Sequence, residues 1–175
     1  MSPYRIMMIA TLAGSIPLIQ NGLSLGQNPI GGAVTVSAED RKFILGAAQS
    51  GLHEVQMGML GVERGTNNDL KAYAQRILDD HTLSNAEVQA LARLKGVALP
   101  DPTKTDGSAI SLSRLTGIEF DQAFVREAIQ DHLRDLAEFE KEDQSSASDA
   151  DIKGFAHSTL PKLRSHLEQA KALKP

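Results

Sequence analysis

Residues 67–96 read NNDLKAYAQRILDDHTLSNAEVQALARLKG, and this stretch decides the fold. Asn67 is a typical helix N-cap residue, and Gly96 is a typical helix terminator. Between them, apolar residues recur every three or four positions, the spacing that gathers side chains on one face of a helix. His81 falls on this apolar face, midway along the segment. The stretch therefore predicts a long amphipathic helix with a metal-capable side chain in its buried stripe.

Three further segments show the same apolar periodicity. One begins at Ser37, a plausible N-cap, and is stopped by Gly65, while the other two cover about 118–143 and 149–173. Ala and Leu are abundant and Val and Ile are sparse, which favours helix over sheet. We therefore expect an all-α protein whose residues 38–173 form a four-helix bundle.

Residues 97–115 form a long linker between the second and third predicted helices. The segment contains Pro100, Pro102 and Gly107 and has no sustained period. Such a stretch spans roughly 60 Å when extended, whereas a helix of about 26 residues is about 40 Å long. We therefore expect a crossover along the whole bundle, with a short helical turn near residues 110–115.

The first 26 residues have the features of a secretory signal. Arg5 precedes an apolar run, and small residues at Ser24 and Gly26 predict cleavage before Gln27. Residues 27–37, rich in Gly and polar residues, are expected to form a flexible leader. These features predict a periplasmic or secreted protein without stable membrane insertion after cleavage. The alternative is an uncleaved membrane anchor.

Charge and cysteine content narrow the classes of function. The chain has 175 residues and a net charge of −4, and its Lys and Arg residues are scattered rather than clustered. The absence of a basic stripe argues against a nucleic-acid partner. There is no Cys, so disulfides and a lipoprotein anchor are excluded. Any metal site must use imidazole, carboxylate or amide ligands.

Four polar residues lie at similar depth on the apolar faces of the four predicted helices. They are Glu54, His81, His132 and His166. Imidazoles and a carboxylate in an apolar core are costly unless they satisfy one another or bind an ion. The set suits Zn, Fe, Mn or Cu, with an affinity expected to fall below about pH 6.5. The alternative is a metal-free cluster in which ionised Glu54 pairs with a protonated histidine.

Other polar residues near these positions are not expected to bind the ion directly. Asp121 and Asn85 are candidates for a second shell around the ion, although Asp121 also suits the first turn of its helix. Asp80 and Asp131 are expected to face solvent or a neighbouring helix, whereas His53 and His157 lie off the apolar stripe and are expected at the surface or at its boundary.

Several short motifs together resemble a known family. They are Gly51-Leu-His-Glu54-Val-Gln-Met-Gly58, Asp80-His81-Thr, Gly117-Ile-Glu-Phe120-Asp121, Asp131-His132 and Thr159-Leu-Pro161-x-Leu-x-x-His166-Leu. Over about residues 38–173 the chain is similar to a secreted bacterial domain-of-unknown-function family with a ferritin-like fold, often labelled "predicted outer membrane protein". The resemblance implies an exported ferritin-like bundle and no established activity.

The chain departs from ferritin-like di-iron proteins at one motif. Their Glu-x-x-His pairs place a carboxylate three residues before the histidine, where this chain has Leu78, Ile129 and Leu163. We expect a metal-binding bundle that holds one ion. The first alternative is a non-enzymatic envelope stress or interaction protein with a structural histidine cluster. The second is an oxidoreductase with a dinuclear site completed by Asp121 or Asn85. Enzymatic activity, partner and oligomeric state are left open.

Overall fold

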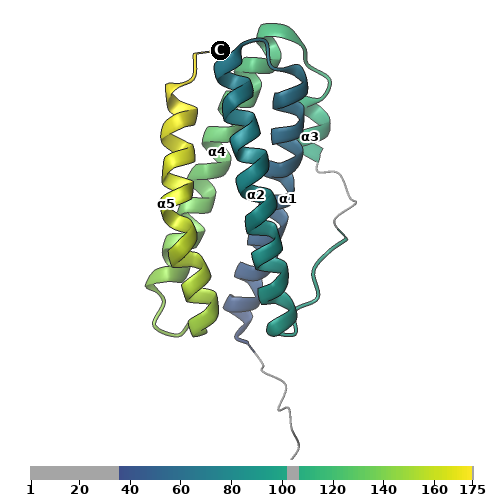
Figure 1. Cartoon of the computed structure of the whole chain (residues 1–175). Helices are drawn as coiled ribbons and strands as arrows, with labels where there is room; N and C mark the ends of the chain where they lie inside the picture. Colours follow the sequence, from purple (N-terminus) through teal and green to yellow (C-terminus); the bar gives the residue numbers. More distant parts are fainter. Residues whose placement is uncertain (1–35, 102–106, 175) are drawn as a thin grey trace, which may run out of the picture. The chain divides into compact units, whose positions relative to one another are not determined.

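The computed structural model describes residues 36–101 and 107–174, and this part of the chain forms helices and no strand (Figure 1). The helices are α1 (Ala38–Arg64), α2 (Asn68–Leu94), α3 (Gly107–Leu112), α4 (Gly117–Gln144) and α5 (Ala150–Ala172). The four long helices correspond to the four predicted segments. The all-α prediction is confirmed.

Side-chain caps fix where three of the long helices begin. The Ser37 hydroxyl accepts from the Asp40 amide, and the Asp40 carboxylate accepts from the Ser37 amide, which forms a capping box. Asn67 caps α2 through the Leu70 amide at 2.8 Å, and Asp149 caps α5. Because these side chains satisfy amides that have no partner inside the helix, the starts predicted from sequence are close to those observed.

The helices pack as a bundle of two hairpins. α1 packs against α2 and α4 against α5, and further contacts join α1 to α4 and α2 to α5. The Thr66 amide, in the α1–α2 loop, donates to Asp121 at the start of α4 over 3.1 Å. At the other end of the bundle, Lys95 lies 2.6 Å from Asp149 at the start of α5. The starts of α2 and α4 therefore share one end, so these two helices are parallel and the predicted crossover is confirmed.

The crossover carries the short helix α3. Helical structure was expected near residues 110–115, and α3 begins and ends three residues earlier. The Arg64 guanidinium, at the end of α1, donates to the carbonyl of Ser113 just after α3. This contact fastens the returning chain to the end of the bundle where α4 begins.

Two separate apolar clusters form the core. One contains Phe43, Ile44, Ala48, Val88, Leu91, Ala92, Val97, Phe139, Ile152, Ala156, Leu160 and Leu163. The other contains Met57, Leu70, Tyr73, Ala74, Ile77, Leu112, Phe120, Phe124, Val125, Ala128 and Ala170. On every long helix, the residue singled out in the sequence lies between the members of these two clusters. The bundle therefore has a buried polar layer between two apolar halves.

Close approach of α1 and α2 explains a glycine inside α1. A Cβ atom at Gly58 would lie 2.9 Å from the Leu78 backbone nitrogen and 3.0 Å from the Ala74 carbonyl oxygen. A larger residue would push the two helices apart at the level next to the polar layer. The helical penalty of glycine, about 1 kcal/mol relative to alanine, is offset here by backbone packing.

The predicted signal, its cleavage point and all but the last two residues of the leader lie outside the described residues. Within the described ranges, none of the helices combines the length and the apolar character needed to cross a bilayer.

Candidate metal centre

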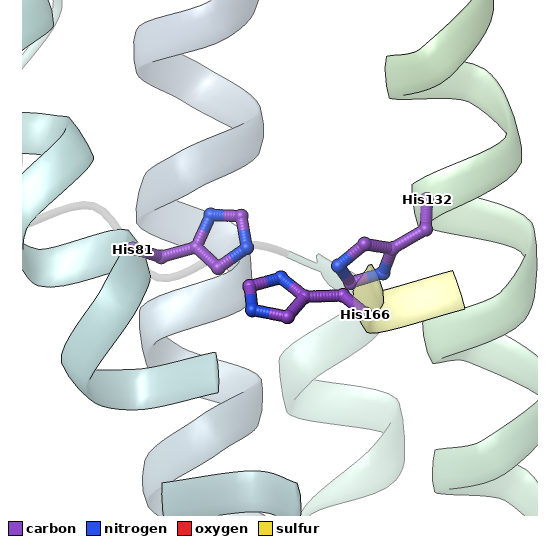
Figure 2. A group of neighbouring side chains, drawn as sticks. All are labelled: His81, His132 and His166. Carbon is purple, nitrogen blue, oxygen red and sulfur yellow. The ribbon is translucent and has the colours of Figure 1, made fainter. Parts of the chain in front are cut away.

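The rings of His81, His132 and His166 meet in the polar layer (Figure 2). They come from α2, α4 and α5, and their centroids lie 5.2 to 5.7 Å apart. One nitrogen of each ring lies within 4.8 Å of one nitrogen of each other ring. All three side chains are at most 6% exposed. We call these residues the core histidines.

Glu54, from α1, reaches the same layer. Its Oε2 atom lies 2.8 Å from His81 Nδ1, and its Oε1 atom lies 3.4 Å from His132 Nε2. Neither oxygen forms a hydrogen bond with these rings, so these approaches are close in distance but poorly aligned. Glu54 and the core histidines thus form one central cluster of a carboxylate and three imidazoles. The core histidines alone already form a group that could hold a metal ion.

Each of the core histidines has one buried ring nitrogen without a hydrogen-bond partner. His132 Nδ1 donates to the Ala128 carbonyl over 2.8 Å, and His166 Nε2 donates to Asp80 Oδ2 over 2.8 Å. These acceptors assign the tautomers. The nitrogens that lack any hydrogen-bond partner are His81 Nε2, His132 Nε2 and His166 Nδ1. Buried polar atoms without partners are costly. In a metal-ligating histidine, one ring nitrogen binds the ion and therefore makes no hydrogen bond, while the other donates a hydrogen bond to a carboxylate or a carbonyl group.

Burial sets the charge of the central cluster. It lowers the pKa of both His81 and His166 to about 4, and it lowers the pKa of His132. It raises the pKa of Glu54 to about 7, against the opposing effect of His132. His81 and His166 are therefore neutral, the form that binds metals, well below the pH of 6.5 expected from their ordinary pKa, and the pKa of His132 is shifted in the same direction. Glu54, with a pKa of about 7, titrates near neutral pH.

Asp80 has a role that the sequence analysis did not give it. Its carboxylate accepts from His166 and lies 3.4 Å from Lys162, so it faces α5 rather than solvent. A carboxylate behind a histidine orients the ring and makes it a better ligand. The sequence signal for this role was the dipeptide Asp80-His81. Successive residues of a helix point about 100° apart, so an Asp next to a core His points toward a neighbouring helix.

Asp131 and His53 form a matching contact on the opposite interface. His53 Nε2 lies 3.0 Å from Asp131 Oδ2, and His53 is only 8% exposed. The prediction of a surface or boundary position is wrong for His53, because α1 packs against α4 at this level. It holds for His157, whose side chain is 76% exposed beside Asp143.

Asp135 is a buried carboxyl group that the sequence analysis missed altogether. It accepts from the Ser50 hydroxyl at 2.7 Å, and burial together with the charge of Glu54 raises its pKa to about 8. Asp135 lies three residues after His132 on α4. In the sequence it looked like one more acid on a charged helix face.

The two residues that were expected to support the ion, Asp121 and Asn85, have other contacts in the structure. Asp121 accepts from the amide and hydroxyl of Thr66, and it is eleven residues, about 16 Å along α4, from His132. It fastens the α1–α2 loop rather than a metal ligand. Asn85 packs on α1, where its Oδ1 would lie 2.2 Å from a Cβ at Gly51. Asp80 occupies the supporting position that these residues were expected to fill.

Comparisons with known proteins agree with this architecture. The model of a family described as "Domain of unknown function (DUF4142)" matches residues 26–173. A solved structure, a DUF305 fragment from Deinococcus radiodurans, is similar with a TM-score of 0.68. That match has 13% sequence identity and covers 78% of this chain and 95% of the other, so it shows a shared fold. No curated protein matches the sequence.

Proposed function

The chain belongs to the DUF4142 family of domains of unknown function, and we propose that it binds one transition-metal ion in the centre of its bundle. The ligands are the core histidines, and Glu54 supplies a fourth ligand or the counter-charge. One observation carries the proposal. Three buried ring nitrogens without hydrogen-bond partners belong to imidazoles that point toward one another from three helices.

The spacing of the imidazoles suits a small first-row ion. Tetrahedral coordination with bonds of about 2.0–2.1 Å places ligand nitrogens about 3.3 Å apart. Nitrogens that already lie within 4.8 Å of one another would have to close by about 1.5 Å at most. Imidazole ligands favour Zn, Cu, Fe or Ni, whereas Mn, like Mg and Ca, prefers carboxylate and water. Of the four ions considered from the sequence, Zn, Fe and Cu therefore suit the core histidines better than Mn.

A structural cluster without metal is the alternative function class. It would belong to a non-enzymatic envelope stress or interaction protein. It requires that the polar atoms of the cluster satisfy one another, but one buried ring nitrogen of each core histidine lacks a hydrogen-bond partner. It also requires an ionised Glu54 beside a protonated histidine, whereas burial favours the neutral form of each.

We further infer that the metal-binding bundle is exported. The inference rests on the charged start, the apolar run and the small residues before Gln27. An export route would place the bundle in the periplasm or outside the cell. N-terminal sequencing of the protein from a periplasmic fraction should give a start at Gln27, and an intact Met1 in the membrane fraction would instead support an anchor.

Titration calorimetry with Zn²⁺ tests the binding proposal. The metal-free wild type should bind one ion per chain, and His132→Gln should weaken binding more than about 100-fold, beyond the effect of losing an outer-shell residue. His157→Gln is the matched control, because it removes an exposed imidazole of the same chemistry. Circular dichroism checks that each variant is folded. Equal Zn²⁺ binding by a folded His132→Gln and the control would overturn the proposal.

A further inference from the structure

The interface between α1 and α4 carries a second group of potential ligands, His53, Glu127 and Asp131. We call this group the outer cluster. One ligand atom of each residue lies within 4.8 Å of the other two, and His53 Nε2 lies 3.0 Å from Asp131 Oδ2 and 3.7 Å from Glu127 Oε1. We propose that the outer cluster is a separate divalent-cation site, more accessible than the central one and better suited to Mn²⁺.

The ligand chemistry favours a harder cation than the central cluster does. Two carboxylates and one imidazole replace three imidazoles, and carboxylate ligands together with water suit Mn, Mg and Ca. The Glu127 side chain is 31% exposed, whereas that of Asp131 is 1% exposed. A cation held between them would have one protein side and one solvent side, and water would fill its remaining positions.

A groove between α1 and α4, of about 810 Å³, leads to this place. Its wall includes Ser50 and His53 on α1 and Asp135 on α4. The basic residues of α1 that also line the groove, Arg41 and Lys42, lie at least eleven residues before His53, about 16 Å along the helix. A hydrated cation that approaches the imidazole through the groove therefore stays away from these two charges, and the basic side chain that it meets near the outer cluster is Arg134 of α4, which also lines the groove.

The outer cluster brings two carboxylates together, with one arginine in contact with Asp131. The charge of Asp131 is one of the causes, after burial, that raise the pKa of Glu54 and of Asp135. The basic group in contact with Asp131 is Arg134, whose side chain is 64% exposed. An exposed guanidinium is a weakly held counter-ion, so a divalent cation can displace it.

A simple ion pair does not account for the geometry as well. A single Nε2–H group has two carboxylates within 3.7 Å but can donate one good hydrogen bond at a time. A divalent ion would serve both carboxylates and the imidazole nitrogen together. The cation site and the simple ion pair also differ in the role of Arg134. In a cation site Arg134 competes with the bound cation, whereas in the ion pair it only adds a second contact to Asp131.

Mn²⁺ binding, followed by electron paramagnetic resonance of the free ion, tests the proposal. In the His132→Gln background, where the central site lacks a ligand, the protein should still bind one Mn²⁺. Adding Glu127→Gln should weaken that binding at least 10-fold, while Glu119→Gln, an exposed acid on the same helix, should leave it unchanged. Arg134→Gln should strengthen Mn²⁺ binding, because it removes the competing cation.

The outcomes separate this site from the central one. If His132→Gln leaves Zn²⁺ binding unchanged but Mn²⁺ binding still depends on Glu127, the outer site is supported and the proposed function is contradicted. If Mn²⁺ binding ignores Glu127→Gln, or if there is none in the folded protein, the outer site is overturned. Should His132→Gln fail to fold, the same Glu127, Glu119 and Arg134 variants in the wild-type background give the answer, since all three side chains are at least partly exposed.

Discussion

The α2/α5 and α1/α4 interfaces each contain an aspartate–histidine contact of similar length, but the two contacts do different things. On α2/α5, Asp80 lies 2.8 Å from His166, whose other nitrogen faces the central cluster. On α1/α4, Asp131 lies 3.0 Å from His53, which faces Glu127 instead. Each aspartate immediately precedes a core histidine, so the same dipeptide supports the central cluster on one interface and builds a second cluster on the other.

The neighbours of each aspartate explain the difference. Asp80 is 29% exposed and lies beside Lys162, so its charge is balanced at the surface and its role is to orient His166. Asp131 also has a basic neighbour, the exposed Arg134, but it is buried and has another carboxylate, Glu127, within reach. An Asp-His dipeptide whose histidine faces the core therefore predicts that the aspartate contacts a neighbouring helix. The residues on that helix decide what the contact does.

The largest expected effect is metal stabilisation that depends on the central cluster. Zn²⁺ at about 100 times its dissociation constant should stabilise the wild type by about 2.7 kcal/mol, or about 5–10 °C in melting temperature. His81→Gln should abolish most of this shift, because it removes one of three imidazole ligands. Differential scanning calorimetry measures it. A shift of equal size in His81→Gln would locate the bound ion elsewhere.

Next in size is the contrast between the two aspartates. Asp80→Asn should weaken Zn²⁺ binding about 10- to 100-fold, because His166 loses the acceptor that orients it. Asp131→Asn should leave Zn²⁺ binding within a few-fold and instead weaken Mn²⁺ binding. Calorimetric titration of both variants with both ions provides the comparison. Equal responses of the two variants would mean that the interfaces do not have separate roles.

The third prediction concerns the pH dependence of stability in the chelator-treated protein. Burial raises the pKa of Glu54 to about 7 and that of Asp135 to about 8. Between pH 6.5 and 8 the folded protein therefore holds protons that the unfolded chain has lost, so the free energy of unfolding should fall as pH rises. Each such proton contributes a slope of about 1.4 kcal/mol per pH unit.

The histidines act in the opposite direction and in a lower range. Burial lowers the pKa of His81 and His166 to about 4, so below pH 6.5 the unfolded chain takes up protons that the folded one does not. Glu54 and Asp135 still hold their protons in this lower range, so the two effects offset one another there, and stability should change little from pH 5 to 6.5 and fall above it. Urea unfolding from pH 5 to 9 tests this, and Asp135→Asn should reduce the slope above pH 6.5. A wild-type stability that rises from pH 6.5 to 8 would contradict the assignment.

The smallest effect is expected at the surface of the α2/α5 interface. Lys162→Gln removes a partner 3.4 Å from Asp80, but the lysine side chain is 39% exposed. Exposed ion pairs contribute about 0–1 kcal/mol, so the free energy of unfolding should change by less than about 1 kcal/mol. Urea unfolding measures this change. A larger loss would show that Lys162, and not only the hydrogen bond from His166, stabilises the charge on Asp80 against its burial.

Much of the fold could be predicted from the sequence because its determinants are local. Apolar periodicity and N-cap residues predicted the four long helices, and the length of 97–115 predicted the crossover. The core histidines and Glu54 were identifiable because each interrupts an apolar stripe at mid-helix. These inferences needed only the position of each residue on its own helix.

The surroundings of the cluster could not be predicted, because they depend on the rotation of each helix relative to its neighbours. Asp80 and Asp131 lie at equivalent positions in sequence, and only the packing determines that one meets His166 and the other His53. Asp121 seemed suited to a supporting role, but it lies about three turns along α4 from His132 and bonds to Thr66. The depth of a residue along its helix could be predicted from the sequence, but the residue that it contacts on the neighbouring helix could not.

An anomalous difference map from a crystal loaded with Zn²⁺, with data collected at the zinc edge, tests the central claim most directly. We predict one strong peak in the polar layer, about 2.0–2.1 Å from a nitrogen of each core histidine, with Glu54 as the nearest carboxylate. An ordered protein in which the zinc peaks lie elsewhere and the three rings remain without an ion would contradict the claim.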